Sequence, residues 1–558
     1  MRILGINAIF HDPAAALVID GESVAAAEEE RFSRRKHGKR PVPFSAWELP
    51  EQAARWCLDV AGIGPQDLDA VAYSYDPALV QPGLAGLDAA WEDLRTTYAR
   101  RAPQFLATAL PGLDPAAVQF VPHHVAHAAS AGLAAPFRDS AVLVADGRGE
   151  ATSYLAGRYR EGELDVLASQ ALPHSLGLMY EEVTDHLGFL RSSDEYKVMA
   201  LASYGRRDHQ WPESRMVPEL RVLRELREFV RATDDGGFVV HPIDWGALAK
   251  RRLPGEELLP EHVMLAASVQ TRLEEVLLEL ARWLHDRTGE RCLTMAGGVA
   301  LNCVANTRLA AEGPFDQVWV QPAAGDAGTA LGGALHLAQT NGELVVPMPG
   351  ADLGREFTDE ELKTWLDNAD IRYERPGDVA VSVADALAED AIVAWFQGRS
   401  EFGPRALGRR SLLAHPGHVG NLDRLNAVKG RERFRPIAPM VLTERAGELF
   451  GRGPIPSPYM LFVHDVADRW RDRIPAVVHV DGTARIQTID RDTEPLLARL
   501  LDRFAERTGL PTVVNTSLNT AGRPMVDDPR DALECFGSAP VDLLALGPFL
   551  LRRREVFR

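Results

Sequence analysis

The sequence has 558 residues, more than one ordinary hydrophobic core can organise, so we expect two or three domains. Its formal net charge of −18 argues against a general nucleic-acid or anionic-membrane binder, because phosphate contacts need a basic face. No apolar run is long enough to cross a bilayer, and four cysteines without paired spacing are typical of a reducing cytoplasm. We therefore expect a cytoplasmic protein with no nucleic-acid or membrane partner.

Apolar segments bounded by turn residues predict strands early in the chain. They are expected within residues 2–10, 14–20, 22–30, 68–75 and 141–147. The first of them makes the opening of the sequence an immediate strand rather than a signal peptide.

Two later segments share one pattern, since residues 292–312 and 317–338 each read as an apolar strand, a glycine turn and a helix. Between residues 205 and 261 the chain is charged and irregular, which predicts an inserted segment. No internal repeat or low-complexity segment is visible. The alternation of strands and helices indicates α/β domains.

A Gly- and Pro-rich stretch, residues 341–354, has the composition of a connection between domains. An apolar strand near residues 391–398 then opens a second α/β unit, which closes with residues 541–551. We expect two domains, residues 1–350 and 351–558.

The segment VPHHVAHAAS carries histidines at helical spacing. In a helix, His123 and His127 project from one face and can share a metal ion, whereas His124 points elsewhere. Asp146 and Asp326 lie at predicted strand ends, where the sites of α/β proteins collect. Two histidines with carboxylates suit iron(II) as well as zinc. The alternative is four buried groups that only hydrogen-bond to one another.

His11 lies in the loop after the first predicted strand, within FHDPAAA. A turn histidine is most often exposed to solvent. Its functional interpretation is a general base that takes a proton from an acceptor hydroxyl, because an imidazole titrates near neutral pH.

Glycine turns between a strand and a helix occur at residues 296–302 and 325–333. This geometry presents backbone N–H groups and the positive end of a helix to a phosphate or ribose. Neither turn matches the GxGxxG or P-loop pattern, and such turns are common in α/β proteins. Because the second turn contains Asp326, the two together favour a nucleotide or acyl nucleotide lying over the metal.

Cationic residues gather in the second predicted domain of this acidic chain. They are Arg399, Arg405, Arg409, Arg410, Lys429, Arg431, Arg433, Arg435 and Arg485, and the segment VVNTSLN adds Asn515 and Ser517. Many of them stand among Gly, Pro and Phe, where solvation is limited. A triphosphate plus a second phosphate needs such a cluster, because each contact is charge-assisted and arginine can bind in bidentate fashion.

Lysine is rare, with six residues against 55 arginines, as the codon bias of a high-GC genome produces. A lysine inside a motif is therefore not explained by composition. The run AEEERFSRRKHGKR has the mixed charge of a solvated loop, and Lys36 is the member expected to act if this loop folds over a phosphate.

A family resemblance rests on motifs that follow one another in matching order over nearly the whole chain. They include FHDPAAALV, AEEERFSRRKHG, HHVAHAAS, VADGRGE, GGVALN, GDAGTALG, EFGPRALGRRS, LNAVKGRERFRPIAP, DGTARIQT and NTSLN. Through them the sequence resembles the NodU/CmcH-type O-carbamoyltransferases. The resemblance implies an actin/sugar-kinase-like (ASKHA) N-terminal domain, similar to tRNA threonylcarbamoyl-transferring enzymes. It also implies a C-terminal YrdC-like domain, an open twisted α/β sheet.

The resemblance further implies a reaction in two halves. Carbamoyl phosphate yields carbamate, ATP with Mg²⁺ converts carbamate into carbamoyl adenylate, and the carbamoyl group then passes to a small-molecule hydroxyl beside an iron ion. It assigns His11 as the base and His123, His127, Asp146 and Asp326 as metal ligands. Carbamoyl adenylate would contact Lys36, Gly297, Gly298, Asn302 and Asp326. ATP and carbamoyl phosphate would contact Arg405, Lys429, Arg435, Arg485, Asn515 and Ser517. The RERFRP segment allows another register, in which Arg431 or Arg433 replaces Arg435.

Two other functions are compatible with parts of the sequence. A tRNA threonylcarbamoyl-type transferase would suit the N-terminal half, but the charge of the chain opposes tRNA binding. A non-enzymatic ATP-binding module would explain the glycine turns and leave the histidine pair without a purpose. For the carbamoyltransferase, a sugar or macrolide hydroxyl of an antibiotic is the expected type of acceptor. The acceptor pocket is expected around residues 73–91 and 205–261, and the sequence determines neither the acceptor nor the oligomeric state.

Overall fold

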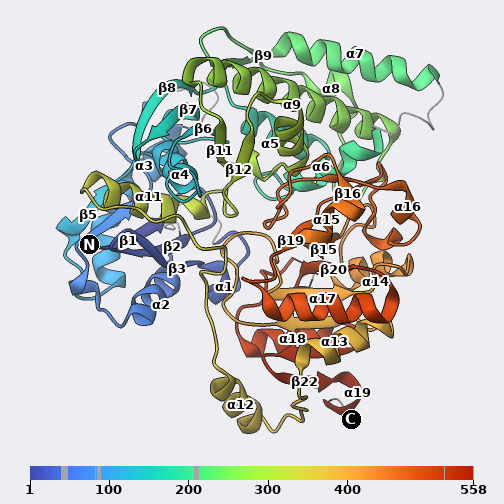
Figure 1. Cartoon of the computed structure of the whole chain (residues 1–558). Coiled ribbons are helices and arrows are strands. Elements are labelled where there is room, and N and C mark those ends of the chain that lie inside the picture. The colour runs from blue at the N-terminus through green and yellow to red at the C-terminus, as the bar shows by residue number, and fades with distance from the viewer. Residues whose placement is uncertain (39–47, 82, 84–88, 206–212, 521, 557–558) are drawn as a thin grey trace. The chain divides into compact units, whose positions relative to one another are not determined.

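The computed structural model describes residues 1–38, 48–81, 83, 89–205, 213–520 and 522–556 (Figure 1). The chain divides into two compact units, Met1–Gly350 and Ala351–Arg558. The boundary lies within the Gly- and Pro-rich stretch 341–354. Among the described residues, no helix is long and apolar enough to span a membrane.

The first sheet of the N-terminal unit has the strand order β3-β2-β1-β4-β5. Its strands are β1 (Arg2–Asn7), β2 (Ala14–Ile19), β3 (Glu22–Glu28), β4 (Ala70–Tyr73) and β5 (Val118–Phe120). β2 is antiparallel to β1 and β3, whereas β4 is parallel to β1 and β5. The three strands expected at the start of the chain are confirmed. Most residues of β1 and β2 are buried, which explains why they read as continuous apolar runs.

The second sheet of this unit has the order β12-β11-β6-β7-β8. Its strands are β6 (Ser140–Ala145), β7 (Thr152–Arg160), β8 (Glu163–Ala171), β11 (Cys292–Ala296) and β12 (Gln317–Val320). β7 is antiparallel to β6 and β8, and β11 is parallel to β6 and β12. In chain order, each sheet thus has three antiparallel strands followed by two parallel strands beside the first. This duplication confirms the actin/sugar-kinase-like fold class of the N-terminal unit, although no repeat is visible in the sequence.

Two helices lie between these sheets and carry residues of the predicted site. α11 (Ala327–Thr340) packs on β1, β2 and β4, and α4 (His123–Gly132) packs on β6, β7, β11 and α11. Close backbone approach makes this possible, because a Cβ added at Gly332 would lie 1.8 Å from the Ala126 carbonyl oxygen. A Cβ at Gly5 would lie equally close, 1.8 Å, to the Ala330 carbonyl oxygen. Glycine at these two positions therefore sets how near the helices come to each other and to β1.

The remaining helices of the N-terminal unit cover the outer faces and the connections. They are α1 (Glu30–Ser33), α2 (Glu51–Ala61), α3 (Ala89–Ala109), α5 (Leu176–His186), α6 (Glu195–Gly205), α7 (Glu213–Phe229), α8 (Trp245–Leu248), α9 (Pro260–Thr288) and α10 (Cys303–Glu312).

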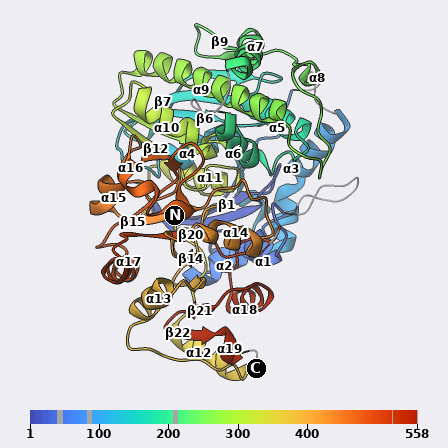
Figure 2. The same cartoon turned by 90° about the vertical axis from the view of Figure 1, so that its right-hand side faces the viewer.

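The segment expected to be an irregular insertion is largely structured, so that expectation was wrong for its described part. It contains α7, the hairpin β9 (Val230–Ala232) and β10 (Phe238–Val240), and α8. α7 packs on α9 and lies beside it in both views (Figures 1 and 2). The buried Arg272 side chain of α9 donates to the Val230 carbonyl oxygen at 2.7 Å. In the part of α7 whose burial is described, Arg221, Arg224 and Arg227 are exposed and Val222 and Leu226 are buried, and charge alone does not distinguish such a helix face from a loop.

The C-terminal unit contains an open mixed sheet of seven strands in the order β19-β15-β20-β14-β13-β21-β22. They are β13 (Val393–Phe396), β14 (Arg410–Ala414), β15 (Ala438–Leu442), β19 (Gln487–Ile489), β20 (Thr512–Ser517), β21 (Leu543–Leu546) and β22 (Phe549–Arg552). β20 is antiparallel to both of its neighbours, β14 and β15, and β15 is parallel to β19. The α/β class expected for this unit is confirmed.

Helices and a small second sheet complete the C-terminal unit. The helices are α12 (Asp359–Asn368), α13 (Val379–Ala388), α14 (Gly420–Val428), α15 (Thr443–Leu449), α16 (Asp468–Arg471), α17 (Pro495–Thr508), α18 (Pro529–Ser538) and α19 (Arg553–Val556). The small sheet is formed by β16 (Phe450–Gly451), β17 (His464–Val466) and β18 (Thr483–Ala484). α17 buries Leu497, Leu501 and Phe504, spaced as on one helix face, against the core of this unit.

Candidate active site

Four residues predicted as metal ligands meet in the N-terminal unit. α4 supplies His123 and His127, Asp146 directly follows β6, and Asp326 stands at the N-cap position of α11. One ligand atom from each residue lies within 4.8 Å of the others. The helical spacing of the two histidines is therefore confirmed, and the fold brings both carboxylates to the same point.

Burial and missing hydrogen bonds set this cluster apart. His123 and His127 are 0 % exposed, and Asp326 is 2 % exposed. Within the described part of the chain, Nε2 of His123 and both ring nitrogens of His127 are buried without a hydrogen-bond partner. The distances from His123 Nε2 to Asp146 Oδ2 and from His127 Nε2 to Asp326 Oδ1 are both 3.6 Å, too long for good hydrogen bonds. Buried orphan nitrogens facing carboxylates are the donor set that Fe²⁺ or Zn²⁺ accepts, so the residues fit a metal ion.

Neighbouring groups fix the orientation of the ligands. His123 Nδ1 lies 3.1 Å from the Ser74 carbonyl oxygen, which directs Nε2 towards the carboxylates. The Gly298 N–H donates to Asp146 Oδ1 at 2.8 Å, and the Thr329 hydroxyl donates to Ser74 Oγ at 2.8 Å. The contacts of Ser74 with His123 and of Gly298 with Asp146 are of the kind that hold ligand side chains in one rotamer.

The two buried carboxylates of the cluster need a compensating positive charge. Burial alone would raise the pKa of Asp326, but the imidazoles of His11, His123 and His127 outweigh it and hold that pKa below its usual range. Burial likewise disfavours a charged His123, yet Asp146 and Asp326 raise its pKa well above the ordinary value. Two buried carboxylates so close together require positive charge between them, from protons or from a metal ion.

His124 lies nearer the cluster than the helical spacing predicts. Its Nδ1 bonds to Thr152 Oγ1 at 2.8 Å, while its Nε2 lies 4.0 Å from Asp146 Oδ2. Burial, reinforced by the charge of His123, lowers the pKa of His124 to about 3, so this imidazole is neutral. The expectation that His124 points elsewhere was wrong, because its position in the first turn of α4 faces the end of β6.

The predicted base reaches the same cluster from its open side. His11 Nε2 lies 3.8 Å from Asp326 Oδ2, and the His11 side chain is 34 % exposed. Its Nδ1 lies 2.9 Å from Asp12 Oδ2. A partly exposed imidazole beside buried ligands can exchange a proton with an incoming molecule.

The first glycine turn makes several contacts within the protein. Gly297 has a φ of +90°, and an added Cβ would lie 2.3 Å from the Ala145 carbonyl oxygen, so the turn packs against the end of β6. Asn302 caps α10 and exchanges hydrogen bonds of 2.8 and 3.0 Å with Gln270. Because Gly298 and Asn302 are already engaged, carbamoyl-adenylate binding by this turn remains a prediction. Lys36 is exposed, next to His37.

In the C-terminal unit, the predicted phosphate contacts converge at one edge of the sheet. Arg405, Arg435 and Arg485 precede β14, β15 and β19, three strands that run in one direction. β20 runs the other way, so its final residues, including Asn515 and Ser517, reach the same edge.

Direct contacts join this edge to Lys429, the residue that follows α14. Lys429 is 7 % exposed, and its Nζ donates to the Ser517 carbonyl oxygen at 2.6 Å and to Ser517 Oγ at 2.8 Å. Asn515 Nδ2 donates to Gln487 Oε1 at 2.7 Å. Arg435 is 20 % exposed at its side chain and Arg433 is 88 % exposed, so the first of them suits a converging site better. We refer to Arg405, Lys429, Arg435, Arg485, Asn515 and Ser517 as the cationic edge.

Comparison with known proteins assigns the chain to a family. The family model described as Carbamoyltransferase N-terminus matches residues 2–335, and the model described as Carbamoyltransferase C-terminus matches residues 384–553. The chain belongs to the carbamoyltransferase family.

Relatives match the carbamoyltransferase along most of its length. Uncharacterized protein sll1178 of Synechocystis is 37% identical, over 99% of this chain and 97% of the relative. Nodulation protein NolNO of Sinorhizobium fredii is 37% identical, over 98% of this chain and 80% of the relative. Nodulation protein NolO of Bradyrhizobium diazoefficiens is 41% identical, over 77% of this chain and 79% of the relative. The protein is therefore an enzyme that transfers carbamoyl groups.

Three arginines near the cationic edge serve the fold of the carbamoyltransferase. Arg410 is 0 % exposed, donates to the Gln397 and Gly398 carbonyl oxygens, and lies over the Phe396 ring at 3.7 Å from its centroid. Arg409 donates to Asp352 and Glu494, and Arg399 donates to the Leu353 and Gly354 carbonyl oxygens. The sequence analysis grouped these three with the other cations. An arginine that binds carbonyls or carboxylates of the protein cannot be distinguished in a sequence from one that binds phosphate.

Several contacts of the two clusters were missed in the sequence. Asn519 accepts hydrogen bonds from Lys429 and, at 2.8 Å, from Ser517, and its presence in NTSLN was the available signal. Glu150 accepts from the His123 N–H at 2.8 Å, and Asp12 contacts His11. Glu150 and Asp12 lie within the motifs VADGRGE and FHDPAAALV, but a motif does not show which contacts its residues make.

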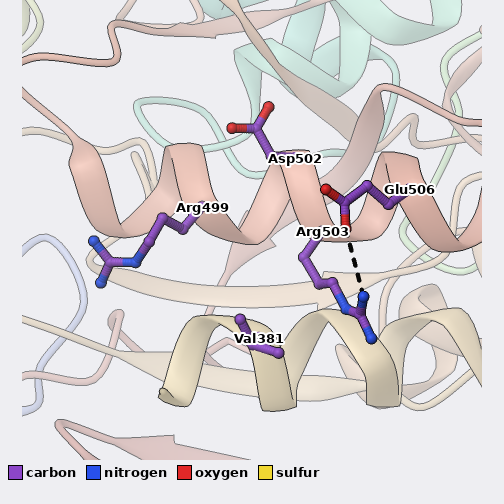
Figure 3. A pocket seen from close by; sticks show the side chains of 5 residues that line it. All are labelled: Val381, Arg499, Asp502, Arg503 and Glu506. Carbon is purple, nitrogen blue, oxygen red and sulfur yellow. Dashed lines mark hydrogen bonds and ion pairs between the residues drawn. The ribbon is translucent and has the colours of Figure 1, made fainter. Parts of the chain in front are cut away.

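A groove between α13 and α17 of the carbamoyltransferase is lined by Val381, Arg499, Asp502, Arg503 and Glu506 (Figure 3). Its charges neutralise one another. Arg499 contacts Asp378 at 3.2 Å, and Arg503 contacts Asp385 at 2.9 Å and Glu506 at 3.4 Å. The pairs of Arg499 with Asp378 and of Arg503 with Asp385 join α17 to α13, and the groove contains none of the predicted site residues.

Proposed function

We propose that the protein is an ATP-dependent O-carbamoyltransferase that makes carbamoyl adenylate and transfers its carbamoyl group to a small-molecule hydroxyl. The observation that carries this proposal is the buried cluster of His123, His127, Asp146 and Asp326, with His11 at its open side. In an enzyme that transfers carbamoyl groups, such a cluster can be the place where the acceptor hydroxyl is deprotonated and attacks the carbamoyl carbon.

The first half-reaction is assigned to the cationic edge of the C-terminal unit. Water cleaves carbamoyl phosphate to carbamate and phosphate, and the carbamate oxygen then attacks the α-phosphorus of ATP, releasing pyrophosphate. Both substrates are polyanions, and ATP arrives with Mg²⁺. The guanidinium groups of Arg405, Arg435 and Arg485 supply charge-assisted hydrogen bonds, and Lys429 adds a nearly buried ammonium. Clustering these cations where β14, β15 and β19 begin supports a site for two phosphate-bearing ligands.

The second half-reaction is assigned to the histidine–carboxylate cluster of the N-terminal unit. His11 Nε2 accepts the proton of the acceptor hydroxyl, the hydroxyl oxygen bonds to the carbamoyl carbon, and AMP leaves with the electron pair of the broken C–O bond. The products are the carbamate ester and AMP. A divalent cation held by the four ligands, which we propose to be Fe²⁺ with Zn²⁺ as the alternative, would supply Lewis-acid polarisation of the carbamoyl carbonyl.

Adenylation explains why ATP is needed. Carbamate is a poor electrophile, and AMP is a good leaving group. Buried surroundings protect the adenylate from hydrolysis, and the ligands of this cluster are almost fully buried. We further propose a sugar or macrolide hydroxyl of an antibiotic-like natural product as the acceptor, and a cytoplasmic setting, which the four free cysteines support.

The test is a complete mass balance. The protein, ATP with Mg²⁺ and carbamoyl phosphate are incubated with a panel of glycosides and macrolides, and products are followed by mass spectrometry. We expect one carbamoyl group on oxygen, with one AMP and one pyrophosphate per product. Formation of ADP in place of AMP would exclude the adenylate route, and carbamoylated amines would exclude the hydroxyl acceptor.

A further inference from the structure

The loop that carries His11 has an unusual backbone. Phe10 and Asp12, on either side of His11, have φ values of 61° and 50°, in the left-handed region that non-glycine residues disfavour. The fully buried Asn7 holds this conformation, because its Nδ2 donates to the His11 carbonyl oxygen at 3.0 Å and to the Asp12 carbonyl oxygen at 2.9 Å. The loop is therefore fixed before any ligand binds.

This backbone directs the Asp12 carboxylate between two histidines. Asp12 Oδ2 lies 2.9 Å from His11 Nδ1, and Asp12 Oδ1 lies 2.8 Å from His37 Nδ1. The other ring nitrogen of His37, Nε2, lies 3.0 Å from Ser193 Oγ, just before α6. The loop after β1 and the turn after α1 thus meet at the Asp12 carboxylate, and the approach to α6 is joined to them through His37.

The hydrogen-bonding capacity of a carboxylate decides the tautomer of His11. An ionised carboxylate only accepts, so the proton of a neutral His11 ring resides on Nδ1. Nε2 then carries the lone pair, and it is Nε2 that faces the metal-ligand cluster, 3.8 Å from Asp326 Oδ2. A serine protease uses the same relation between an aspartate and a histidine.

We propose that Asp12 is a positioning residue that holds His11 in the tautomer with a basic Nε2 directed at the acceptor hydroxyl, and that His37 and Ser193 fix the second oxygen of Asp12. This inference rests on the proposed function in one respect, the role of His11 as the base. It adds to that function a carboxylate–imidazole pair outside the metal ligands and the phosphate contacts.

The kinetic test uses Asp12→Asn, which keeps the shape of the side chain but cannot accept from both histidines. We expect the turnover number of transfer to fall by roughly two to four orders of magnitude, with the KM for acceptor and the acceptor-free release of pyrophosphate unchanged. Asp370→Asn is the matched control, because Asp370 is an exposed aspartate with a φ of 51° in the other unit. An unchanged transfer rate in folded Asp12→Asn overturns the proposal.

A double-mutant cycle separates positioning from a general structural role. If Asp12 acts through His11, Asp12→Asn has no further effect in a His11→Ala background. An equal loss in both backgrounds overturns the proposal, because it shows that Asp12 acts through something else.

The tautomer itself can be observed without any activity. Long-range ¹H–¹⁵N spectra of the zinc-loaded full chain, with the His11 signals assigned by their loss in His11→Ala, should show a protonated Nδ1 that Asp12→Asn abolishes. A wild-type His11 protonated on Nε2 overturns the proposal even if the enzyme transfers carbamoyl groups. If no acceptor is ever carbamoylated, the proposed function fails and the spectra still decide the role of Asp12.

Discussion

His127 Nε2 lies 3.6 Å from Oδ1 of Asp326, a separation too long for a good hydrogen bond and suited to one ion that contacts both atoms. The two residues come from α4 and from the start of α11, helices whose close approach depends on Gly332. This pair is the structural observation that most directly supports the proposed metal site.

Replacement of His127 should release that metal. We expect His127→Ala to bind iron or zinc at least about tenfold more weakly, since it deletes a ligand and leaves two buried carboxylates with less compensation. The measurement is metal content per chain by mass spectrometry after dialysis. His285→Ala, at a partly exposed histidine of α9, is the control and should retain metal. A full metal complement in folded His127→Ala would contradict the ligand assignment.

Loss of the Lys429 ammonium should stop the first half-reaction. Lys429→Ala is expected to lower acceptor-free pyrophosphate release by at least roughly two orders of magnitude, because a nearly buried charge at the phosphate site is removed. Some loss of stability, about 1–3 kcal/mol, should accompany it, since Ser517 and Asn519 lose a donor. Lys363→Ala, at the half-exposed pair with Asp367, is the control. Wild-type pyrophosphate release by a folded Lys429→Ala protein would remove this residue from the site.

His11 should matter only for the second half-reaction. In His11→Ala we expect pyrophosphate release without acceptor to remain at the wild-type rate, while carbamoyl transfer slows by roughly two to four orders of magnitude. Rapid-quench measurement of both steps on one preparation provides the comparison. The division of labour between the units is wrong if the variant no longer consumes ATP when acceptor is absent.

Stability should fall as pH rises, because of Glu29. Burial is the main influence and raises the pKa of this carboxyl to about 7, although Gln52 and Ala53 donate hydrogen bonds to it. The folded state therefore holds a proton that the unfolded state releases near pH 4.5, and the stability this provides is lost between about pH 4.5 and pH 7.

The corresponding variant is Glu29→Gln. Between pH 4.5 and pH 8, the free energy of unfolding of this variant in urea should fall less than that of the wild type. The difference between the two decreases should be about 2–3 kcal/mol. Glu22→Gln, at an exposed carboxyl of β3, should behave as the wild type does. Identical pH profiles for Glu29→Gln and the wild type would show that Glu29 does not hold this proton.

Much of the local structure was predictable because it depends on neighbouring residues. The apolar runs at the start of the chain became β1, β2 and β3, and the spacing of His123 and His127 became one face of α4. The charged segment 205–261 was misjudged, since the amphipathic pattern of α7 is weak. The duplication of the two sheets was also missed, because hydrogen-bond order and strand direction can repeat while residues do not.

Among the cations, the sequence could not separate those that serve the fold from those at the cationic edge. Arg410 and Lys429 both stand in motifs rich in glycine and charge. Only the packing shows that Arg410 contacts backbone carbonyls and the Phe396 ring, while Lys429 contacts the end of β20.

The sequence by itself determined the family, the α/β class and the residue types of both clusters, since motifs, periodicity and charge are local properties. Only the tertiary structure decided that Asp146 and Asp326 face the same two histidines, that His124 lies beside them, and that Asp12 joins His11 to His37. Those relations depend on which strands pair and how closely helices pack, and chain segments distant in sequence encode them jointly.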